Sequence, residues 1–277
     1  MNIKEIIKSA IAEDVGPGDY SSLSTIPTNA TNSAKLLIKE DGILAGIDIA
    51  EEVFRQVDST LKFEKKIEDG TQVKIGDIAF IVSGSAISIL TGERLALNFM
   101  QRMSGIATST NKYVKAIEGT STKILDTRKT TPLLREFEKY SVKVGGGENH
   151  RFALYDMIMI KDNHIDFAGG IAEAIDSCNK YLSDNSLDLR IEIEVRNNNE
   201  LEQVLKKGNI HRIMLDNYSP NQISEALILI DKRYETEASG GITIETIRLY
   251  AETGVDYISV GALTHHIKSQ DMSLVAF

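Results

Sequence analysis

The sequence feature that most constrains the fold is a repeated alternation of short β-rich runs with amphipathic stretches, which starts near residue 108. The β-rich runs are residues 123–125, 157–160, 191–195, 212–215, 235–238 and 257–260. Apolar residues at helical spacing occupy residues 168–182, 198–207, 219–232 and 243–253. Strands that alternate with helices predict a parallel sheet, and this number of units favours an α/β barrel or partial barrel over a two-layer sandwich.

The first third of the chain has a different rhythm and is predicted to form a separate α/β unit. We expect a short amphipathic helix within residues 1–10. Helices are also expected at 48–57 and 86–103, and they alternate with β-like runs at 34–38, 42–46, 61–63 and 78–82. The change of rhythm places the expected boundary between an N-terminal domain, 1–107, and a barrel domain, 108–265.

Polar or glycine-rich clusters follow the β-rich runs of the expected barrel. They are Asp126-Thr-Arg-Lys129, Lys161-Asp-Asn-His164, Glu194-Val-Arg196, Asp216-Asn217, Ser239-Gly-Gly241 and Gly261-Ala-Leu-Thr264. One polar residue after a strand is usually a solvated loop residue, but a succession of such clusters is difficult to attribute to ordinary turns. Because barrel active sites lie at the C-terminal ends of the strands, these clusters predict the functional site.

The last two clusters have the composition of a phosphate site. In barrels, loops after the final strands often bind phosphate, since glycine lets backbone N–H groups approach the oxygens. Ser239, Gly240 and Gly241, followed by an apparent helix, would supply these donors, and Gly261 with His265 would form the opposite wall. The alternative is that these glycines only form tight turns.

Two acidic residues, Glu194 and Asp216, end neighbouring strands. Facing carboxylates can share Mg²⁺ with waters and substrate oxygens, hydrogen-bond sugar hydroxyls, or stabilise a developing oxocarbenium ion. Glu192 has the same strand parity as Glu194 and is a second candidate inward acid. The alternative is a salt bridge from these acids to Arg196 or Arg212.

Five cationic side chains form the complementary half of the expected site: Arg128, Lys129, His150, Arg151 and Lys161. They belong to an acidic chain of net charge −9, so they predict an anionic small ligand and no nucleic-acid or membrane partner. Arginine suits carboxylates, while lysine and protonated histidine supply point charges. A ligand set with several carboxylates and a phosphorylated sugar would use both halves, which indicates transfer chemistry between an acidic acceptor and a sugar phosphate.

Composition also indicates where the protein works. The single Cys178 excludes an internal disulfide and suits a reducing compartment. Residues 1–10 contain no apolar run of signal-peptide type, and no stretch approaches the ~20 apolar residues of a membrane span. We therefore expect a cytoplasmic protein.

The motifs closely resemble those of the quinolinate phosphoribosyltransferase family, also called nicotinate-nucleotide pyrophosphorylase (carboxylating). They are Asp126-Thr-Arg-Lys-Thr-Thr-Pro132, Lys143-Val-Gly-Gly-Gly147, Asn149-His-Arg151, Ile160-Lys-Asp-Asn-His164, Glu192-Ile-Glu-Val195, Leu215-Asp-Asn217, Glu237-Ala-Ser-Gly-Gly241 and Ser259-Val-Gly-Ala-Leu-Thr-His265. The resemblance covers almost the whole chain, and Asp126-Thr-Arg-Lys-Thr is highly specific. It implies an N-terminal α/β sandwich, an open barrel of the type II phosphoribosyltransferase kind, and a C-terminal tail, 266–277, that returns to the first domain.

The resemblance implies a pentosyl transfer in NAD biosynthesis: quinolinate and phosphoribosyl pyrophosphate give nicotinate mononucleotide, pyrophosphate and CO₂, with Mg²⁺. By similarity, the five cations line the quinolinate and pyrophosphate region, and Arg94 reaches in from the partner subunit of a homodimer, with larger assemblies left open. Glu194 and Asp216 would contact the ribose or Mg²⁺. The 5′-phosphate would meet Ser239, Gly240, Gly241, Gly261 and His265. The catalytic residues would be Lys129, Lys161, Glu194 and Asp216.

Two positions depart from the family pattern. Glu148 replaces an expected lysine, which puts the charge balance near His150 in question, and His266 stands where serine is usual. Three rival functions remain: a pyrophosphorylase-like protein associated with molybdenum transport, a Schiff-base aldolase that uses Lys161, and a non-catalytic sensor of an anionic metabolite. The intact Arg128-Lys129 and His150-Arg151 pairs argue against the first of these rivals.

Overall fold

The computed structural model describes residues 2–277, which divide into two compact units. The first unit contains the chain up to Asn111 together with Thr130–Gly146 and Leu263–Phe277. The second contains Lys112–Lys129 and Gly147–Ala262. The domain boundary expected from the sequence assigns residues 130–146 and 263–265 to the barrel domain, whereas both segments group with the first unit.

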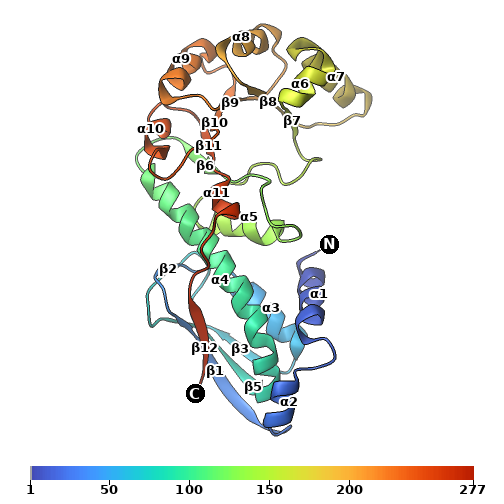
Figure 1. Cartoon of the computed structure of the whole chain (residues 1–277), viewed down its shortest axis with the longest axis vertical. Helices are drawn as coiled ribbons and strands as arrows, with labels where there is room; N and C mark the ends of the chain where they lie inside the picture. Colours follow the sequence, from blue (N-terminus) through green and yellow to red (C-terminus); the bar gives the residue numbers. More distant parts are fainter. Residues whose placement is uncertain (1) are drawn as a thin grey trace. The chain divides into compact units, whose positions relative to one another are not determined.

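The first unit is built on a four-stranded antiparallel sheet of order β12-β1-β5-β3 (Figure 1). Its elements are α1 (Ile3–Val15), α2 (Tyr20–Thr25), β1 (Thr31–Ile38), β2 (Gly42–Ile43), α3 (Ile47–Val57), β3 (Lys62–Lys65), β4 (Gln72–Val73), β5 (Ile78–Ser85), α4 (Ala86–Ala116, which continues into the second unit), α5 (Arg135–Val144), α11 (Ala262–His265, which begins in the second unit) and β12 (Met272–Ala276). Strand β12 pairs antiparallel with β1, so the C-terminal segment belongs to this unit, as the family resemblance implied.

Local chemistry explains where two helices of this unit begin. Asn2 and Glu5 form a capping box, in which each side chain accepts a hydrogen bond from the other residue's backbone N–H. Helix α3 begins after Gly46, whose φ of +101° favours glycine. The carboxylate of Asp69 accepts hydrogen bonds from the N–H groups of Gly46 (2.8 Å) and Ile47 (3.1 Å), which satisfies two donors that the helix itself leaves unpaired.

Segment 130–146 joins the first unit through contacts with α4. The rings of Phe99 and Phe137 stack with centroids 5.0 Å apart. The carboxylate of Glu138 accepts hydrogen bonds from Arg102 at 2.6 and 2.9 Å and from the N–H of Thr131 at 3.2 Å. These contacts are made by side chains far apart in the sequence, so the strand–helix rhythm gave no sign of them.

The second unit is a six-stranded parallel sheet of order β6-β11-β10-β9-β8-β7. Its elements are β6 (Lys123–Leu125), β7 (Ile158–Ile160), α6 (Asp162–Ala168), α7 (Ile171–Asp184), β8 (Ile191–Val195), α8 (Asn198–Lys207), β9 (Arg212–Asp216), α9 (Pro220–Ile230), β10 (Glu235–Ser239), α10 (Ile247–Ala251) and β11 (Tyr257–Ser259). Strands β6 and β7 end the order at opposite edges, so the barrel is open. The fold class is confirmed.

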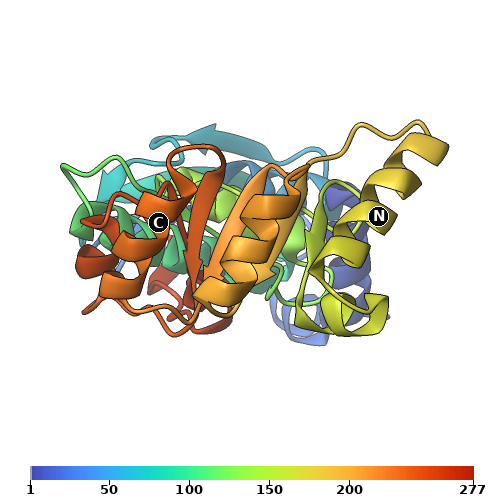
Figure 2. The same cartoon turned by 90° about the horizontal axis from the view of Figure 1, so that it is seen from above.

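The two faces of this sheet differ in chemistry because side chains alternate along each strand. Ile191, Ile193 and Val195 of β8 are buried and apolar, and they alternate with Glu192 and Glu194. Helices α7, α8 and α9, drawn in yellow to orange, run along the outside of the sheet (Figure 2). The acidic positions of β8 therefore belong to the inner face of the open barrel.

Most expected elements of the barrel formed close to their predicted positions, with one correction that bears on the site. The helix expected at 243–253 is only α10, Ile247–Ala251, because residues 244–246 form a turn first. Helix α4, which begins in the first unit, continues to Ala116, well beyond the expected end at residue 103. Within residues 2–277, no helix is both long and apolar enough to cross a membrane.

Candidate active site

Polar side chains occupy successive levels along the inner face of the barrel. Arg212 lies in register between Glu192 of β8 and Glu235 of β10. Two residues further along β9, Met214 lies between Glu194 and Glu237. At the C-terminal ends, Asp216 is in register with Ser239. The inner face thus has charged side chains in the interior of the barrel. The opening at the C-terminal ends of the strands, which we call the mouth, contains Glu194 and Asp216, the two acids expected from the sequence.

The mouth combines one lysine with two carboxylates. Lys161, which follows β7, forms an ion pair with Glu194, whose side chain is 10% exposed. Burial and the charge of Glu194 raise the pKa of Asp216, while Lys161 opposes this shift. The predicted alternative partners are engaged elsewhere: Arg196 binds Glu200 at 2.6 Å, and Arg212 binds Glu235 and Glu237. Glu194 and Asp216 therefore do not form the alternative salt bridges to these arginines, whereas Glu192 does lie 4.0 Å from Arg212.

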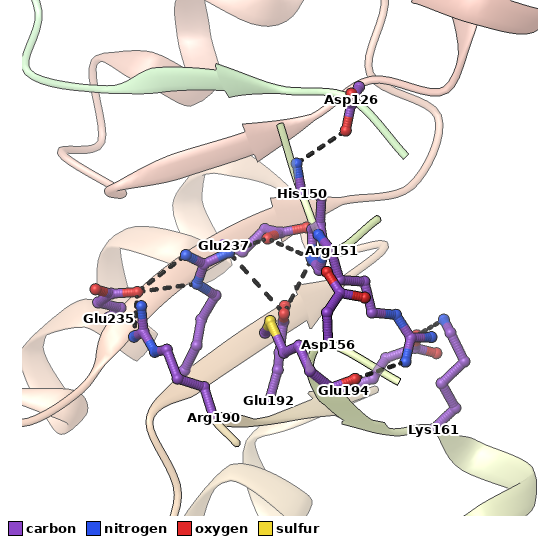
Figure 3. A network of polar contacts seen from close by, with 12 residues as sticks. Asp126, His150, Arg151, Asp156, Lys161, Arg190, Glu192, Glu194, Glu235 and Glu237 are labelled. Atoms are coloured by element: carbon purple, nitrogen blue, oxygen red, sulfur yellow. Dashed lines mark hydrogen bonds and ion pairs between the residues drawn. The ribbon is translucent and has the colours of Figure 1, made fainter. Parts of the chain in front are cut away.

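His150 lies below the mouth, in contact with two buried carboxylates (Figure 3). Its Nε2 atom is 3.0 Å from Glu192 and 3.3 Å from Glu237. Its backbone N–H donates to Asp126, which follows β6, at 2.8 Å. Burial alone would lower the pKa of His150, but the two carboxylates outweigh it and raise this pKa to about 9.

Two arginines lie close enough for their charges to interact. Burial and the neighbouring charge of Arg128 lower the pKa of Arg151, although Glu192 opposes this shift. Arg151 donates to the carbonyl of Met157 at 3.1 Å, whereas the Nε of Arg128 is buried and has no hydrogen-bond partner among the described residues. A buried guanidinium donor without a partner is costly, so this atom suits an anionic ligand.

The glycines after β10 would let a ligand approach the backbone closely, but no helix begins directly after them. Gly240 has φ +99° and Gly241 has φ +63°. A Cβ on Gly240 would overlap the side-chain oxygen of Asn217 and lie 2.9 Å from its backbone nitrogen. Because α10 begins only at Ile247, the helix dipole expected directly after Gly241 is absent from this segment.

This geometry predicts different effects of alanine at the two glycines. Gly240→Ala is expected to weaken binding of an anionic ligand at this loop at least tenfold, because the added Cβ overlaps Asn217 and displaces the loop. Gly241→Ala is the comparison: both positions carry the strain of a positive φ, about 1–3 kcal/mol, but a Cβ on Gly241 meets no atom within 4 Å. Titration of both variants with inorganic phosphate would measure the effect, and equal affinities would contradict a close approach of the ligand to the backbone of Gly240.

The remaining predicted residues occupy different parts of the fold. Lys129 is exposed, and its backbone N–H bonds to Thr127 Oγ1 at 3.0 Å. Arg94 is exposed on α4 in the first unit. His265 is also exposed and belongs to the same unit, and its ring packs against that of His266 with centroids 4.4 Å apart. Gly261 follows β11 and is half-buried.

Glu148, which departs from the family pattern, has its own partner in the second unit. Its carboxylate pairs with Lys123 at 2.8 Å, and its backbone forms a bridge with Leu125 at the edge of the sheet. Glu192 and Glu237 are the carboxylates that raise the pKa of His150, whereas Glu148 pairs with Lys123.

Sequence reasoning missed the part played by Glu237 and Arg212. Their positions on β10 and β9 match the parity of Ser239 and Asp216, which would have identified them as inward-facing residues. It also missed Arg102 and Glu138, whose pairing depends on tertiary contacts between α4 and α5.

Two groups of residues could be considered for a metal. His150, Glu192 and Glu237 bring three potential ligand atoms within 4.8 Å of one another. However, Arg212 lies 3.1 Å from Glu237 and 4.0 Å from Glu192, so the guanidinium of Arg212 already neutralises part of the charge of these carboxylates. At the mouth, Glu194 and Asp216 are neighbouring oxygen donors with one paired lysine, and this set fits a hydrated Mg²⁺ better.

Fold and site together define an enzyme of the open α/β-barrel class with an anion-binding mouth. Residues 19–104 match the family model for the quinolinate phosphoribosyl transferase N-terminal domain, and residues 106–275 match the C-terminal domain model. The chain belongs to the quinolinate phosphoribosyltransferase family, which confirms the resemblance of its motifs.

Similar proteins include both curated sequences and solved structures. Quinolinate phosphoribosyltransferase [decarboxylating] 1b of Nicotiana tabacum is 46% identical over 99% of this chain and 82% of its own length. The probable nicotinate-nucleotide pyrophosphorylase [carboxylating] of Bacillus subtilis is 40% identical over 99% and 93%. The crystal structure of NadC from Streptococcus pyogenes has a TM-score of 0.94 at 41% identity, over 99% of this chain and 97% of that one.

Proposed function

We propose that this protein transfers the phosphoribosyl group of phosphoribosyl pyrophosphate to quinolinate and removes a carboxylate, giving nicotinate mononucleotide, pyrophosphate and CO₂ in NAD biosynthesis. Family membership supports this reaction. The structural observation that supports it most is the buried, unpartnered Nε of Arg128 beside Arg151, because a dicarboxylate would satisfy these adjacent guanidinium groups.

The two halves of the mouth have complementary tasks in this reaction. Arg128, Arg151 and Lys161 hold the carboxylates and orient the ring nitrogen toward the anomeric carbon. As pyrophosphate leaves, positive charge develops on the ribosyl ring, and the carboxylates of Glu194 and Asp216 stabilise this charge. The ion pair between Lys161 and Glu194 couples the two halves directly.

Decarboxylation then requires little further from the protein. Once the ring nitrogen is bonded to ribose it is positively charged, and it accepts the electron pair of the bond to the 2-carboxylate. CO₂ leaves, and a proton takes its place on the ring carbon. This sequence requires no enzymic nucleophile, and the half-buried thiol of Cys178, whose pKa is raised by burial, takes no part in it.

We propose Mg²⁺ as the cofactor, held by Glu194 and Asp216 with water and substrate oxygens. Its chemical contribution would be to neutralise charge on the pyrophosphate. Lys129 and Lys161 would supply further positive charge to the leaving group, and Ser239, Gly240, Gly241, Gly261 and His265 are proposed to bind the 5′-phosphate.

We propose a homodimer in which Arg94 enters the partner's site. Its exposed position on α4 is compatible with a role outside its own unit. A complementation assay tests this: Arg94→Ala and Asp216→Asn, each inactive alone, should regain part of the activity when mixed and reassembled. Two chains that stay inactive after verified subunit exchange would contradict the shared site.

We place the protein in the cytoplasm. One half-buried cysteine suits a reducing compartment, although plant relatives are named as mitochondrial or chloroplastic proteins. Cell fractionation with an antibody to the chain would test the location, and recovery in an organelle or membrane fraction would contradict it.

The function is tested by offering the protein either quinolinate or nicotinate together with phosphoribosyl pyrophosphate and Mg²⁺. Quinolinate should give nicotinate mononucleotide, while nicotinate should react far more slowly because it has one carboxylate. Arg128→Ala should raise the KM for quinolinate about 10²-fold, since a charge-assisted hydrogen bond is worth about 1.5–3 kcal/mol, with a smaller change in kcat. Turnover of nicotinate and none of quinolinate would overturn the proposal.

A further inference from the structure

A buried ionic cluster lies below the mouth and consists of His150, Glu192, Arg212 and Glu237. The carboxylates of Glu192 and Glu237 are fully buried, the ring of His150 is 5% exposed, and the side chain of Arg212 is 9% exposed. Barrel interiors are usually filled at such levels by branched apolar side chains. Buried charged groups are costly unless they are paired, so their presence here requires a structural or chemical reason.

The charges of this cluster balance when His150 is protonated and both carboxylates are ionised. Two carboxylates face one guanidinium: Arg212 lies 3.1 Å from Glu237 and 4.0 Å from Glu192. His150 Nε2 contacts both carboxylates, at 3.0 and 3.3 Å. A proton on Glu192 would also neutralise the cluster, since burial and the charge of Glu237 raise the pKa of Glu192 to about 7. The pKa of His150 is the higher of the two, about 9, so the ring holds the proton.

We propose that Glu192 and Glu237 are positioning residues, which hold the ring of His150 protonated and fixed so that the dicarboxylate-binding side of the mouth has a permanent positive charge. This inference rests on the proposed function and adds to it a pair of residues that act through His150. The backbone N–H of His150 donates a hydrogen bond to the carboxylate of Asp126 at 2.8 Å, which fixes the backbone at His150. Arg151, the next residue, is thereby held at the mouth.

One contact opposes protonation of the ring. The backbone N–H of Arg151 donates to His150 Nδ1 at 2.6 Å, which favours the neutral form. Contacts with ionised partners are about twice as strong as neutral hydrogen bonds, and the ring has two such partners on its other nitrogen. The carboxylates therefore prevail, and protonation requires the Arg151 amide to turn away from Nδ1. The raised pKa of His150 agrees with this balance.

The charged groups near His150 come from several strands of the sheet. They are Glu192 on β8, Arg212 on β9, Glu237 on β10, Asp126 after β6 and Arg151 in its own segment. Removal of one contacting carboxylate leaves the ring with a single carboxylate that Arg212 also contacts, while burial continues to favour the neutral ring. The pKa of His150 should then fall toward or below its ordinary value.

The test compares Glu192→Gln with the unchanged protein across pH. In the unchanged protein the KM for quinolinate should stay nearly flat between pH 6 and 8, because His150 keeps its proton. In Glu192→Gln it should rise about tenfold over that range as the ring becomes neutral, with a smaller change in kcat, and Glu237→Gln should behave in the same direction. Glu200→Gln is the matched control and should keep a flat profile, since Glu200 is a largely buried glutamate that pairs with Arg196 and not with any residue of the cluster.

A second measurement does not depend on activity or on the proposed function. The ¹⁵N chemical shifts of His150, assigned by comparison with a His150→Gln variant, should report a charged ring at pH 7.5 in the unchanged protein and a neutral ring in Glu192→Gln. A neutral ring in the unchanged protein overturns the inference, and so does a flat KM profile in a folded Glu192→Gln. If the unchanged protein does not use quinolinate, the reaction assignment fails, while the charge state of His150 is still decided by the spectrum.

Discussion

Replacing Asp216 by asparagine is expected to lower kcat about 10²–10³-fold, with little change in the KM for quinolinate. The carboxylate lies at the end of β9 near Glu194, and in the proposed reaction its negative charge would face the developing cation of the ribosyl ring. Loss of one fixed electrostatic partner of a transition-state charge typically costs a factor of this size. The amide keeps the shape of the side chain but removes its charge, so the substitution isolates the electrostatic contribution.

Steady-state kinetics with both substrates would measure this effect, with melting temperature as the check on folding. Asp184→Asn is the control, because that carboxylate is 57% exposed and pairs only with a surface lysine, Lys180, among the contacts of the described residues. A change confined to KM, or a loss of activity that parallels a loss of stability, would show that Asp216 does not act in catalysis.

Replacing Arg102 by alanine is expected to destabilise the first unit by about 3 kcal/mol, which corresponds to a fall in melting temperature on the order of 10 °C. Arg102 donates twice to Glu138, whose side chain is 1% exposed, and once to Thr131 Oγ1 at 2.7 Å. Without the guanidinium, a buried carboxylate loses its charged partner. The contacts between α4 and the segment that begins at residue 130 weaken with it.

Arg55→Ala provides a matched comparison, because Arg55 also binds a glutamate through two guanidinium nitrogens but is 53% exposed. Its loss should leave the melting temperature almost unchanged, because solvent screens an exposed ion pair. The double variant Arg102→Met with Glu138→Met should be more stable than Arg102→Ala, since it leaves no buried charge. Equal melting temperatures for Arg102→Ala and Arg55→Ala would show that burial of the first pair has no energetic consequence.

The parallel strands and their inward acids could be predicted because their signals are local. The strand at 191–195 coincides with β8, and the alternation that placed Glu192 and Glu194 on one face follows from the geometry of any strand. The clusters after the strands could also be located, since the strand ends bring them to one edge of the sheet. The family motifs then supplied the chemistry that residue types alone left open.

The errors share a different physical origin. Arg212 was the alternative partner for Glu192, Glu194 or Asp216, but apart from Glu192 at 4.0 Å its long side chain binds Glu235 and Glu237 on the adjacent strand. Strand β12 was not predicted, because its partner β1 lies more than two hundred residues earlier in the chain. The helical spacing at 243–253 predicted too long a helix, since residues 244–246 form a turn before α10 begins. In each case a tertiary contact or a local turn outweighed the sequence pattern.

The central claim is a transfer that releases one particular carboxylate, and isotopic labelling tests it most directly. Quinolinate labelled with ¹³C in the 2-carboxylate, incubated with phosphoribosyl pyrophosphate, Mg²⁺ and the protein, should release one labelled CO₂ for each nicotinate mononucleotide formed. Quinolinate labelled in the 3-carboxylate should keep its label in the nucleotide. Nucleotide formed without CO₂, or label released from the 3-carboxylate, would contradict the account.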